Sequence, residues 1–160
     1  MRRMSPEEFK SALGRWVTGV AVVTTRSRGG EVAGLTANSF TSVSLDPPLV
    51  LFCLAHSATS KPAFDSTDRF AVNILGESQR ALAVGFSQSG GDKFAGVSWQ
   101  PGLLGIPLLD GAVAHLECRI VQTHPAGDHT IMVGEVERIR FSGQKPLVHY
   151  RGAYGSFNGA

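Results

Sequence analysis

The stretch AVAHLECRIVQTHPAGDHTIMVGEVERIRF, residues 112–141, decides the fold. Its two ends, 112–123 and 130–141, are rich in β-branched and other apolar residues and are the longest candidate strands of the chain. Between them lies HPAGDH, residues 124–129, whose proline and glycine favour a turn. The stretch therefore predicts a long antiparallel pair of strands.

Shorter strands accompany this pair. They are predicted at residues 20–25, 31–35, 40–45, 49–54, 69–74 and 146–150. Arg28-Gly29-Gly30 supplies a hairpin turn, and Asp46-Pro47-Pro48 ends one strand before the next begins. Because no strand–helix–strand alternation recurs, a doubly wound parallel sheet is disfavoured. We expect a mainly β fold, an antiparallel barrel that is closed or nearly closed, with a few short peripheral helices.

Three short helices are predicted. The first begins at Ser5-Pro6-Glu7-Glu8, a capping box with proline at the first helical position, and ends near Thr18-Gly19. Its apolar residues Phe9, Ala12, Leu13 and Trp16 are spaced to form one stripe, which we expect to face a core. The other two helices cover 60–64 and 78–86, with Ser60 and Ser78 as caps, and the glycine-rich residues 87–105 form a surface loop.

The composition limits the function classes. A chain of 160 residues with 42% hydrophobic and 18% charged residues predicts one globular domain spanning residues 1–160. Its net charge of +2 is too small to indicate nucleic acid or an anionic membrane as a partner. The apolar runs are too short to span a bilayer, and residues 1–10 lack a signal-peptide core, so we expect a soluble, cytoplasmic protein. Cys53 and Cys118 lie outside any CxxC pair, so neither a metal site nor a disulfide is indicated.

Several large enzyme classes lack their motifs in this chain. It contains no G-x-G-x-x-G, no G-x-x-x-x-G-K-[ST], no H-E-x-x-H and no G-x-S-x-G. The carboxylates are scattered, so no pair suited to acid–base catalysis is visible.

Two polar clusters can bind a ligand. In GLTANSFTSVS, residues 34–44, hydroxyl and amide side chains alternate with apolar ones, which suits a flat heteroaromatic ligand with a polar edge. The same pattern fits an ordinary edge strand with its polar side chains in water. In HSATSKP, residues 56–62, hydroxyls and a lysine surround a helix start, which suits a phosphate and equally fits a simple helix cap.

Two further clusters involve histidine and glycine. Gly127-Asp128-His129 offers an imidazole at a barrel rim that can hydrogen-bond an amide or a phosphate, although Gly-Asp is also a common turn. The tail RGAYGSF, residues 151–157, has glycines that let a ligand approach and a tyrosine that can stack, but it also fits a frayed terminus. The histidines at 115, 124 and 149 are assigned to structure.

Five segments in register along nearly the whole chain resemble the flavin reductase family with the FMN-binding split-barrel fold, the reductase components of two-component flavin-dependent monooxygenases. The segments are RWVTGVAVVTT (15–25), GLTANSFTSVS (34–44) followed by PPLV (47–50), FAVNIL (70–75), GDHTIMVGEV (127–136) and RGAY (151–154). Each segment alone is weakly specific, whereas the five together in this order are specific.

The resemblance implies a role for particular residues. Thr36, Ala37, Asn38, Ser39, Phe40, Ser42 and Val43 would line the isoalloxazine ring and ribityl chain of the flavin. Ser57, Ala58, Thr59, Ser60 and Lys61 would hold the flavin phosphate, and Phe86 would touch the flavin from the loop side. His129 would act as the catalytic-site residue that contacts the nicotinamide nucleotide, with Gly152 and Tyr154 closing on the same nucleotide.

The implied activity is NAD(P)H-dependent flavin reduction, in which hydride passes from nicotinamide C4 to flavin N5 and the reduced flavin goes to a separate oxygenase. No side-chain base is needed, because the flavin carries the chemistry. FMN or FAD, and NADH or NADPH, stay open. A homodimer with the flavin near the subunit interface is implied as well. The alternative is a flavin-binding carrier of the same barrel without reductase turnover. A split-barrel oxidase or heme-related protein is less favoured, because it does not need the 151–157 tail.

Overall fold

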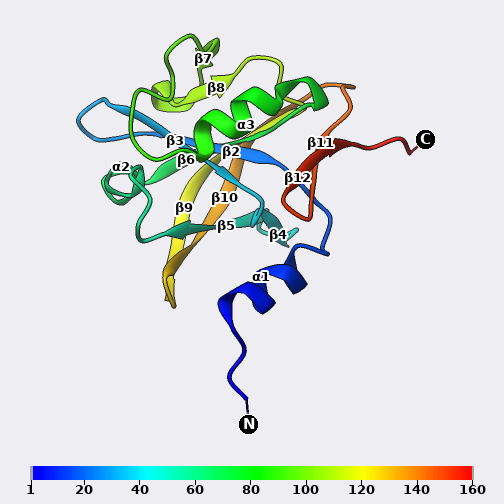
Figure 1. Cartoon of the computed structure of the whole chain (residues 1–160). Coiled ribbons are helices and arrows are strands. Elements are labelled where there is room, and N and C mark those ends of the chain that lie inside the picture. The colour runs from blue at the N-terminus through cyan, green and yellow to red at the C-terminus, as the bar shows by residue number, and fades with distance from the viewer. Residues whose placement is uncertain (1, 160) are drawn as a thin grey trace.

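The computed structural model describes residues 2–159 and contains the long strand pair (Figure 1). β9 (Ala114–Ala126) and β10 (His129–Phe141) pair in antiparallel register from Ala114↔Phe141 to Ala126↔His129. Gly127 makes the turn with φ +62°, a backbone conformation that favours glycine. Residues 124–126 were expected in the loop but belong to β9, because their backbone pairs with β10.

A seven-stranded antiparallel sheet is built around this pair, in the order β3-β2-β6-β9-β10-β5-β4. The remaining strands are β2 (Ala21–Arg26), β3 (Val32–Ala37), β4 (Thr41–Ser44), β5 (Leu49–Ala55) and β6 (Arg69–Ile74). All of them confirm strands predicted from the sequence. The fold is therefore mainly β and antiparallel, as expected.

The sheet must curl, because its two edge strands are consecutive in the chain. If the sheet were flat, β3 and β4 would be six strand spacings apart, which is about 29 Å at about 4.8 Å per spacing. Residues 38–40 connect them, and the four residue steps from Ala37 to Thr41 reach at most about 14 Å. The edges are therefore brought close, yet in the described part of the chain β3 and β4 do not pair with each other. We use the name "the split" for residues 38–40 together with the edge strands β3 and β4 that they join.

The core lies on both sides of β2. Within the curled sheet, the rings of Phe52, Phe64 and Phe70 pack together, with Phe52 5.1 Å from Phe70 and 5.6 Å from Phe64 between centroids. A second cluster contains Val22, Leu75, Leu109 and Phe86, the last on α3 (Arg80–Ser87). The two clusters fix β2 and β3 from opposite faces and so hold one edge of the split in place.

Smaller elements complete the structure. α2 (Lys61–Asp65) follows β5, and a 3₁₀ turn, η1 (Glu77–Gln79), precedes α3, so Ser78 lies inside a turn and does not cap the helix. The loop after α3 contains the short hairpin of β7 (Trp99–Pro101) and β8 (Pro107–Leu109), with η2 (Leu103–Gly105) between them. β1 (Thr18–Gly19), β11 (Leu147–Tyr150) and β12 (Ala153–Ser156) form a separate three-stranded sheet. The tail is thus a strand and not a frayed terminus.

The first helix is present but its apolar stripe is not buried. α1 (Pro6–Leu13) has the predicted capping box and ends at Leu13, short of the predicted Thr18-Gly19. No residue of α1 is buried; Phe9 is 49% exposed, and Trp16, just after the helix, is 77% exposed. Figure 1 shows the reason: α1 lies to one side of the sheets, and no other helix or strand of the described residues covers it. The expectation that the stripe faces a core of this chain is therefore wrong.

Between Arg2 and Gly159, no helix is long and apolar enough to cross a membrane. In the same residues, no group of three or more histidine, cysteine and acidic side chains is placed to hold a metal ion.

Candidate functional site

A large cavity lies at the split. Its volume is about 730 Å³, and we call it the Asn38 cavity because Asn38, Ser39 and Phe40 line it. Leu13 and Trp16 supply apolar walls, so the exposed end of the α1 stripe faces this cavity. A smaller cavity of about 220 Å³, lined by Thr18, Ala37, Asn38, Phe40 and Ile74 among others, adjoins it. Apolar walls with an amide between them are what a planar heteroaromatic ligand requires.

The C-terminal tail meets the predicted flavin segment here. Asn38 Nδ2 lies 3.3 Å from His149 Nδ1, and the ring of His149 lies 5.6 Å from that of Tyr154. Tyr154 is in turn contacted by the guanidinium of Arg80, 5.8 Å from the ring centroid. Gly152 makes the β11–β12 turn with φ +76° and lines the Asn38 cavity. The structure thus brings Asn38 close to Gly152 and Tyr154, which are more than a hundred residues away from it in sequence.

His149 was assigned to structure from the sequence, but the structure places it in the Asn38 cavity. It lies in β11 opposite Thr18 of β1. Its local sequence pattern is the same as that of a histidine that packs in a strand. Asn38 becomes its neighbour only because β1 pairs with β11 in the fold. A sequence signal for this contact is absent.

Not every predicted flavin residue presents its side chain to a cavity. The Thr36 hydroxyl donates to the Ala83 carbonyl at 2.6 Å, and Ser39 Oγ accepts the backbone N–H of Cys53 at 2.9 Å. Ala37 is buried, whereas Ser42 and Val43 lie exposed on the edge strand β4. Asn38 and Phe40 therefore line the Asn38 cavity, whereas the side-chain hydroxyls of Thr36 and Ser39 are engaged by hydrogen bonds within the chain.

The predicted phosphate segment follows β5. Ser57 and Thr59 are exposed, and Ala58 packs against the Phe52 core. Lys61 Nζ pairs with Asp65 at 2.6 Å along α2. Ser60 was expected to cap this helix, but its side chain makes no capping bond. It is 7% exposed, and its Oγ has no hydrogen-bond partner in the part of the chain that the structure describes.

Ser60 opens onto a second cavity, of about 440 Å³, which we call the Ser60 cavity. Gly34 of β3, Thr59, Lys93 and Phe94 also line it. Lys93 Nζ donates to the carbonyls of Gly34 at 3.3 Å and Phe86 at 3.2 Å, and burial lowers the pKa of Lys93. No ion pair of Lys93 is present among residues 2–159.

Sequence reasoning missed Lys93 because it lies in the glycine-rich loop, and only the fold places that loop beside Ser60. Phe86, which was predicted to touch the flavin, is 1% exposed. Its ring packs 5.0 Å from Phe94, and a Cβ at Gly34 would lie 3.0 Å from it. Phe86 thus supports β3 and Phe94 from beneath.

His129 lies at the tip of the β9–β10 hairpin. Its Nδ1 is 2.6 Å from Asp128 Oδ1, and this hydrogen bond, with the imidazole charge, lowers the pKa of Asp128. The side chain of His129 is 42% exposed. The Asp128 contact fixes which ring nitrogen faces outward.

His129 and the split lie at the same end of the sheet. Ile131 pairs with Cys53 on β5, and the Cys53 N–H donates to Ser39 on the other side of that strand. Ser39 is two strand spacings from Ile131, with β5 between them, and His129 is two residues from Ile131 along β10. These two offsets put the backbone of His129 about 12 Å from that of Ser39. That separation suits two stacked planar ligands, one against the split and one reaching His129.

The residues present fit a flavin. Within residues 2–159, two buried hydroxyls of cavity-lining residues have no hydrogen-bond partner: Thr18 Oγ1, beside the Asn38 cavity, and Ser60 Oγ, beside the Ser60 cavity. Both oxygens are buried just behind the cavity surfaces, and an unpartnered buried hydroxyl costs free energy.

Comparison with known proteins agrees with this geometry. Residues 13–158 match the model of the flavin reductase like domain. The chain belongs to the flavin reductase like family. It is similar to the FMN reductase (NADH) SmoA of Agrobacterium fabrum, with 43% identity over 150 residues that cover 94% of this chain and 85% of SmoA. It is also similar to the reductase subunit HsaB of a flavin-dependent monooxygenase from Mycobacterium tuberculosis, with 38% identity over 155 residues, 95% of this chain and 82% of HsaB.

Among solved structures of this family, the NADH:FAD oxidoreductase SgcE6 of Streptomyces globisporus C-1027, in complex with NAD and FAD fragments, superposes with a TM-score of 0.90. It shares 38% sequence identity with this chain, and the match covers 98% of this chain and 97% of SgcE6. The predicted family and the mainly β fold are therefore confirmed.

Proposed function

We propose that this protein is an NAD(P)H:flavin oxidoreductase that supplies reduced flavin to a separate oxygenase. The observation that carries the proposal is the split: two strand edges held close and not paired with each other in the described chain, with the Asn38 cavity and the Ser60 cavity along the β3 side. The names of SmoA and HsaB support the reaction and the kind of partner.

In this proposal the flavin ring lies at the split. Asn38 contributes its amide, Phe40 and Ala37 an apolar wall, and the backbone at Thr36 and Ser39 hydrogen bonds to the ring edge. Ser42 and Val43 border the ribityl side on β4. When bound, the flavin supplies a ring nitrogen, N5, that accepts hydride from a reduced nicotinamide.

The flavin phosphate is held by residues 57–61, joined by Lys93. Ser57, Thr59 and Ser60 offer hydroxyls, and Lys61 and Lys93 offer ammonium groups. Ala58 anchors the segment by packing on the core, and Phe86 contributes by supporting Gly34 and Phe94. Lys61 is paired with Asp65, whereas Lys93 forms no ion pair within residues 2–159, although Glu31 and Asp92 also line the Ser60 cavity.

His129 is assigned to the nicotinamide nucleotide, with Gly152 and Tyr154 closing on it from the tail. His129 donates or accepts a hydrogen bond through the outward Nε2, which Asp128 keeps in place. The protein then positions two planar rings and excludes water, and no side chain needs to take a proton. Both FMN and FAD, and both NADH and NADPH, are proposed as substrates to be tested separately, since SmoA is named for FMN and SgcE6 for FAD.

The working protein is proposed to be a homodimer in the cytoplasm, where reduced nicotinamide is available. Exposed apolar residues gather near the split; Leu13 is 57%, Trp16 77%, Val43 48% and Leu45 94% exposed. A second copy that covers this surface would also enclose the Asn38 cavity. The match over residues 13–158 supports one domain spanning the chain.

The test is anaerobic oxidation of NADH and NADPH with riboflavin, FMN and FAD added one at a time, each with flavin binding measured by fluorescence. A reductase oxidises a nicotinamide only when a flavin is present. Tight flavin binding with no nicotinamide oxidation would instead establish the carrier alternative.

A further inference from the structure

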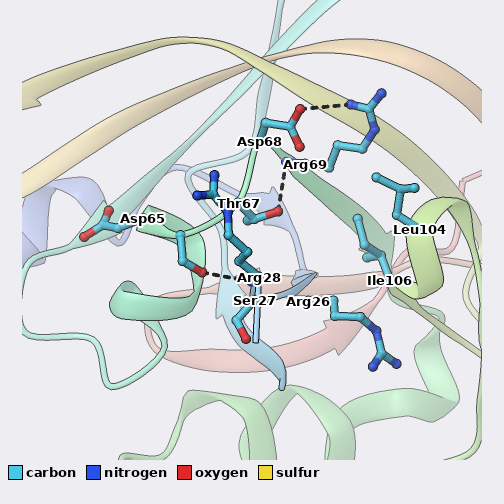
Figure 2. Close-up of a pocket in the computed structure, with 10 residues that line it drawn as sticks. Arg26, Ser27, Arg28, Asp65, Thr67, Asp68, Arg69, Leu104 and Ile106 are labelled. Atoms are coloured by element: carbon cyan, nitrogen blue, oxygen red, sulfur yellow. Dashed lines mark hydrogen bonds and ion pairs between the residues drawn. The ribbon is translucent and has the colours of Figure 1, made fainter. Parts of the chain in front are cut away.

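The cleft of about 430 Å³ in Figure 2 lies at the turn between β2 and β3. Two of its arginines are engaged within the fold: Arg26 Nε donates to the Gly105 carbonyl at 2.8 Å, and Arg69 pairs with Asp68 at 3.6 Å. The guanidinium groups of Arg26, Arg28 and Arg69 point to different sides of the cleft. This cleft therefore joins elements of the fold, unlike the Asn38 cavity, where one polar side chain has no part in the function proposed above.

That side chain is His149, on β11. It is the central residue of a row across the three-stranded sheet, opposite Thr18 on β1 and Tyr154 on β12. Its ring meets that of Tyr154 edge-on, with the centroids 5.6 Å apart and the planes at 61°. Side chains directly opposite each other on antiparallel strands lie on the same face of the sheet and contact each other. The imidazole is therefore flanked by a neighbour on each side, which limits how far its ring can turn.

The Asn38 amide has a single hydrogen-bond partner among residues 2–159, the imidazole of His149. Asn38 Nδ2 lies 3.3 Å from His149 Nδ1. The amide nitrogen can only donate, so Nδ1 accepts and the proton of the neutral imidazole is on Nε2. The amide oxygen Oδ1 and the second N–H are left for a ligand in the cavity.

This contact decides how the amide is presented. Asn38 is exposed and lies in the connection between β3 and β4, so its side chain would turn freely without an anchor. Turning the amide over exchanges its oxygen and its nitrogen, which replaces an acceptor by a donor at the same place. The polar edge of a flavin ring presents carbonyl oxygens and an N–H in a fixed order. An amide that is already oriented binds such an edge at a lower entropic cost.

We propose that His149 is a positioning residue of the flavin site: its Nδ1 holds the Asn38 amide in the orientation in which that amide binds the polar edge of the flavin ring. The inference rests on the function proposed above and adds to it, since His149 acts through Asn38. Tyr154, across the strand, keeps the imidazole in place. Because riboflavin and FMN share the ring, the effect is the same for both.

The experiment is fluorescence titration of the full chain with riboflavin and with FMN, in wild type and in two variants of His149. His149→Phe keeps a ring against Tyr154 and removes the acceptor, so we expect the Kd of both flavins to rise by the same factor, about fivefold. His149→Asn is the matched variant, because its Oδ1 is an acceptor at the same number of bonds from the backbone as Nδ1. It is expected to recover most of the affinity. Thermal unfolding shows whether each variant keeps the fold.

A double-mutant cycle tests whether His149 acts through Asn38. Asn38→Ala alone is expected to weaken flavin binding. Adding His149→Phe to Asn38→Ala is expected to change the Kd further by less than about twofold, because the amide that His149 positions is gone. A role of His149 in the fold alone would instead give the same factor in both backgrounds.

Four results overturn the inference while leaving the proposed function in place. They are an unchanged flavin Kd in His149→Phe, a His149→Phe loss that persists in full when Asn38 is alanine, no recovery in His149→Asn, and a loss for FMN with riboflavin unchanged, which would place His149 at the phosphate. Wild type that binds neither flavin would overturn the proposed function together with this inference.

Discussion

At the scale of the residue, His129 and Lys93 are alike: each is a polar side chain held in place by a neighbouring group, and each is proposed to bind a ligand. Asp128 fixes His129, and two backbone carbonyls fix Lys93. Neither residue needs to transfer a proton, so their effects should appear in binding and alignment.

The His129→Ala variant is expected to raise the nicotinamide nucleotide KM about tenfold while flavin affinity stays unchanged, because one hydrogen bond to a charged ligand is lost. Steady-state kinetics with each nucleotide measures this. His124→Ala is the matched control, since His124 is on the same hairpin and its side chain hydrogen-bonds Gln122, at 3.0 Å. Unchanged KM and turnover in His129→Ala would remove His129 from the site.

Lys93→Gln is expected to weaken FMN binding about tenfold or more and to leave riboflavin binding unchanged, because riboflavin has no phosphate for the ammonium to meet. Flavin fluorescence titrations measure both affinities. Lys93→Arg, which keeps the charge, should restore most of the FMN affinity, and Lys145→Gln serves as an exposed control. Equal losses for FMN and riboflavin would show that Lys93 acts only by bracing β3.

Cys118 provides a prediction about pH. Burial, with Glu137 and Glu117 nearby, raises the pKa of Cys118 to about 12. The folded chain thus keeps a thiol proton that the unfolded chain loses, so the free energy of unfolding should fall as pH rises above about 9. Chemical denaturation between pH 8 and about 11 tests this. Cys118→Ala should flatten that part of the dependence, and an unaltered slope in the variant would refute the assignment.

At the scale of the element, the β9–β10 hairpin positions His129 relative to the split, and its middle depends on a close approach. A Cβ at Gly134 of β10 would lie 2.5 Å from Phe70 Cζ and 2.9 Å from Cys118 Cβ. The register also shifts between Val133 and Gly134, as a bulge does. Glycine at this point lets β10 lie against the core.

Gly134→Ala is therefore expected to destabilise the fold by about 1–3 kcal/mol through overpacking, with a lowered Tm in thermal unfolding. Gly143→Ala is the control, since nothing lies within 4 Å of a Cβ there and its φ is not positive. Equal Tm values for the two variants would contradict the packing of β10 described here.

The strands could be predicted from the sequence because their signal is local: β-branched runs bounded by Gly30 or by Pro47-Pro48 need no tertiary information. The site is different. Asn38 and Tyr154 were found through a family resemblance, whereas His149 and Lys93 reach the cavities only because β11 pairs with β1 and the 88–98 loop folds back on β3. Pairing over such sequence distances leaves no local pattern.

The α1 helix shows a second limit of prediction from local sequence. Its capping box predicted the start of the helix correctly, since the box involves residues three apart. Its apolar stripe predicted burial, but the surface that would cover it is not part of this chain's described structure. An amphipathic pattern predicts that one face of a helix is covered, but it does not predict whether the same chain or another chain covers it.

At the scale of the whole molecule, the exposed apolar surface around Trp16 is expected to be covered by a second copy. Trp16→Glu should convert a two-chain species into a one-chain species in sedimentation and lower flavin affinity, because Trp16 also lines the Asn38 cavity. Val84→Glu on α3, on the far side from α1 in Figure 1, is the control and should leave the assembly intact. A wild-type monomer at micromolar concentration would refute the dimer.

The central claim is that a flavin at the split accepts hydride directly from a nicotinamide that reaches His129. Anaerobic single-turnover bleaching of protein-bound FMN measures this most directly, using NADH and NADH deuterated at the transferred C4 position. The account predicts bleaching that is slower, by a primary isotope effect, with the deuterated nucleotide. Bound FMN that neither NADH nor NADPH bleaches would contradict it.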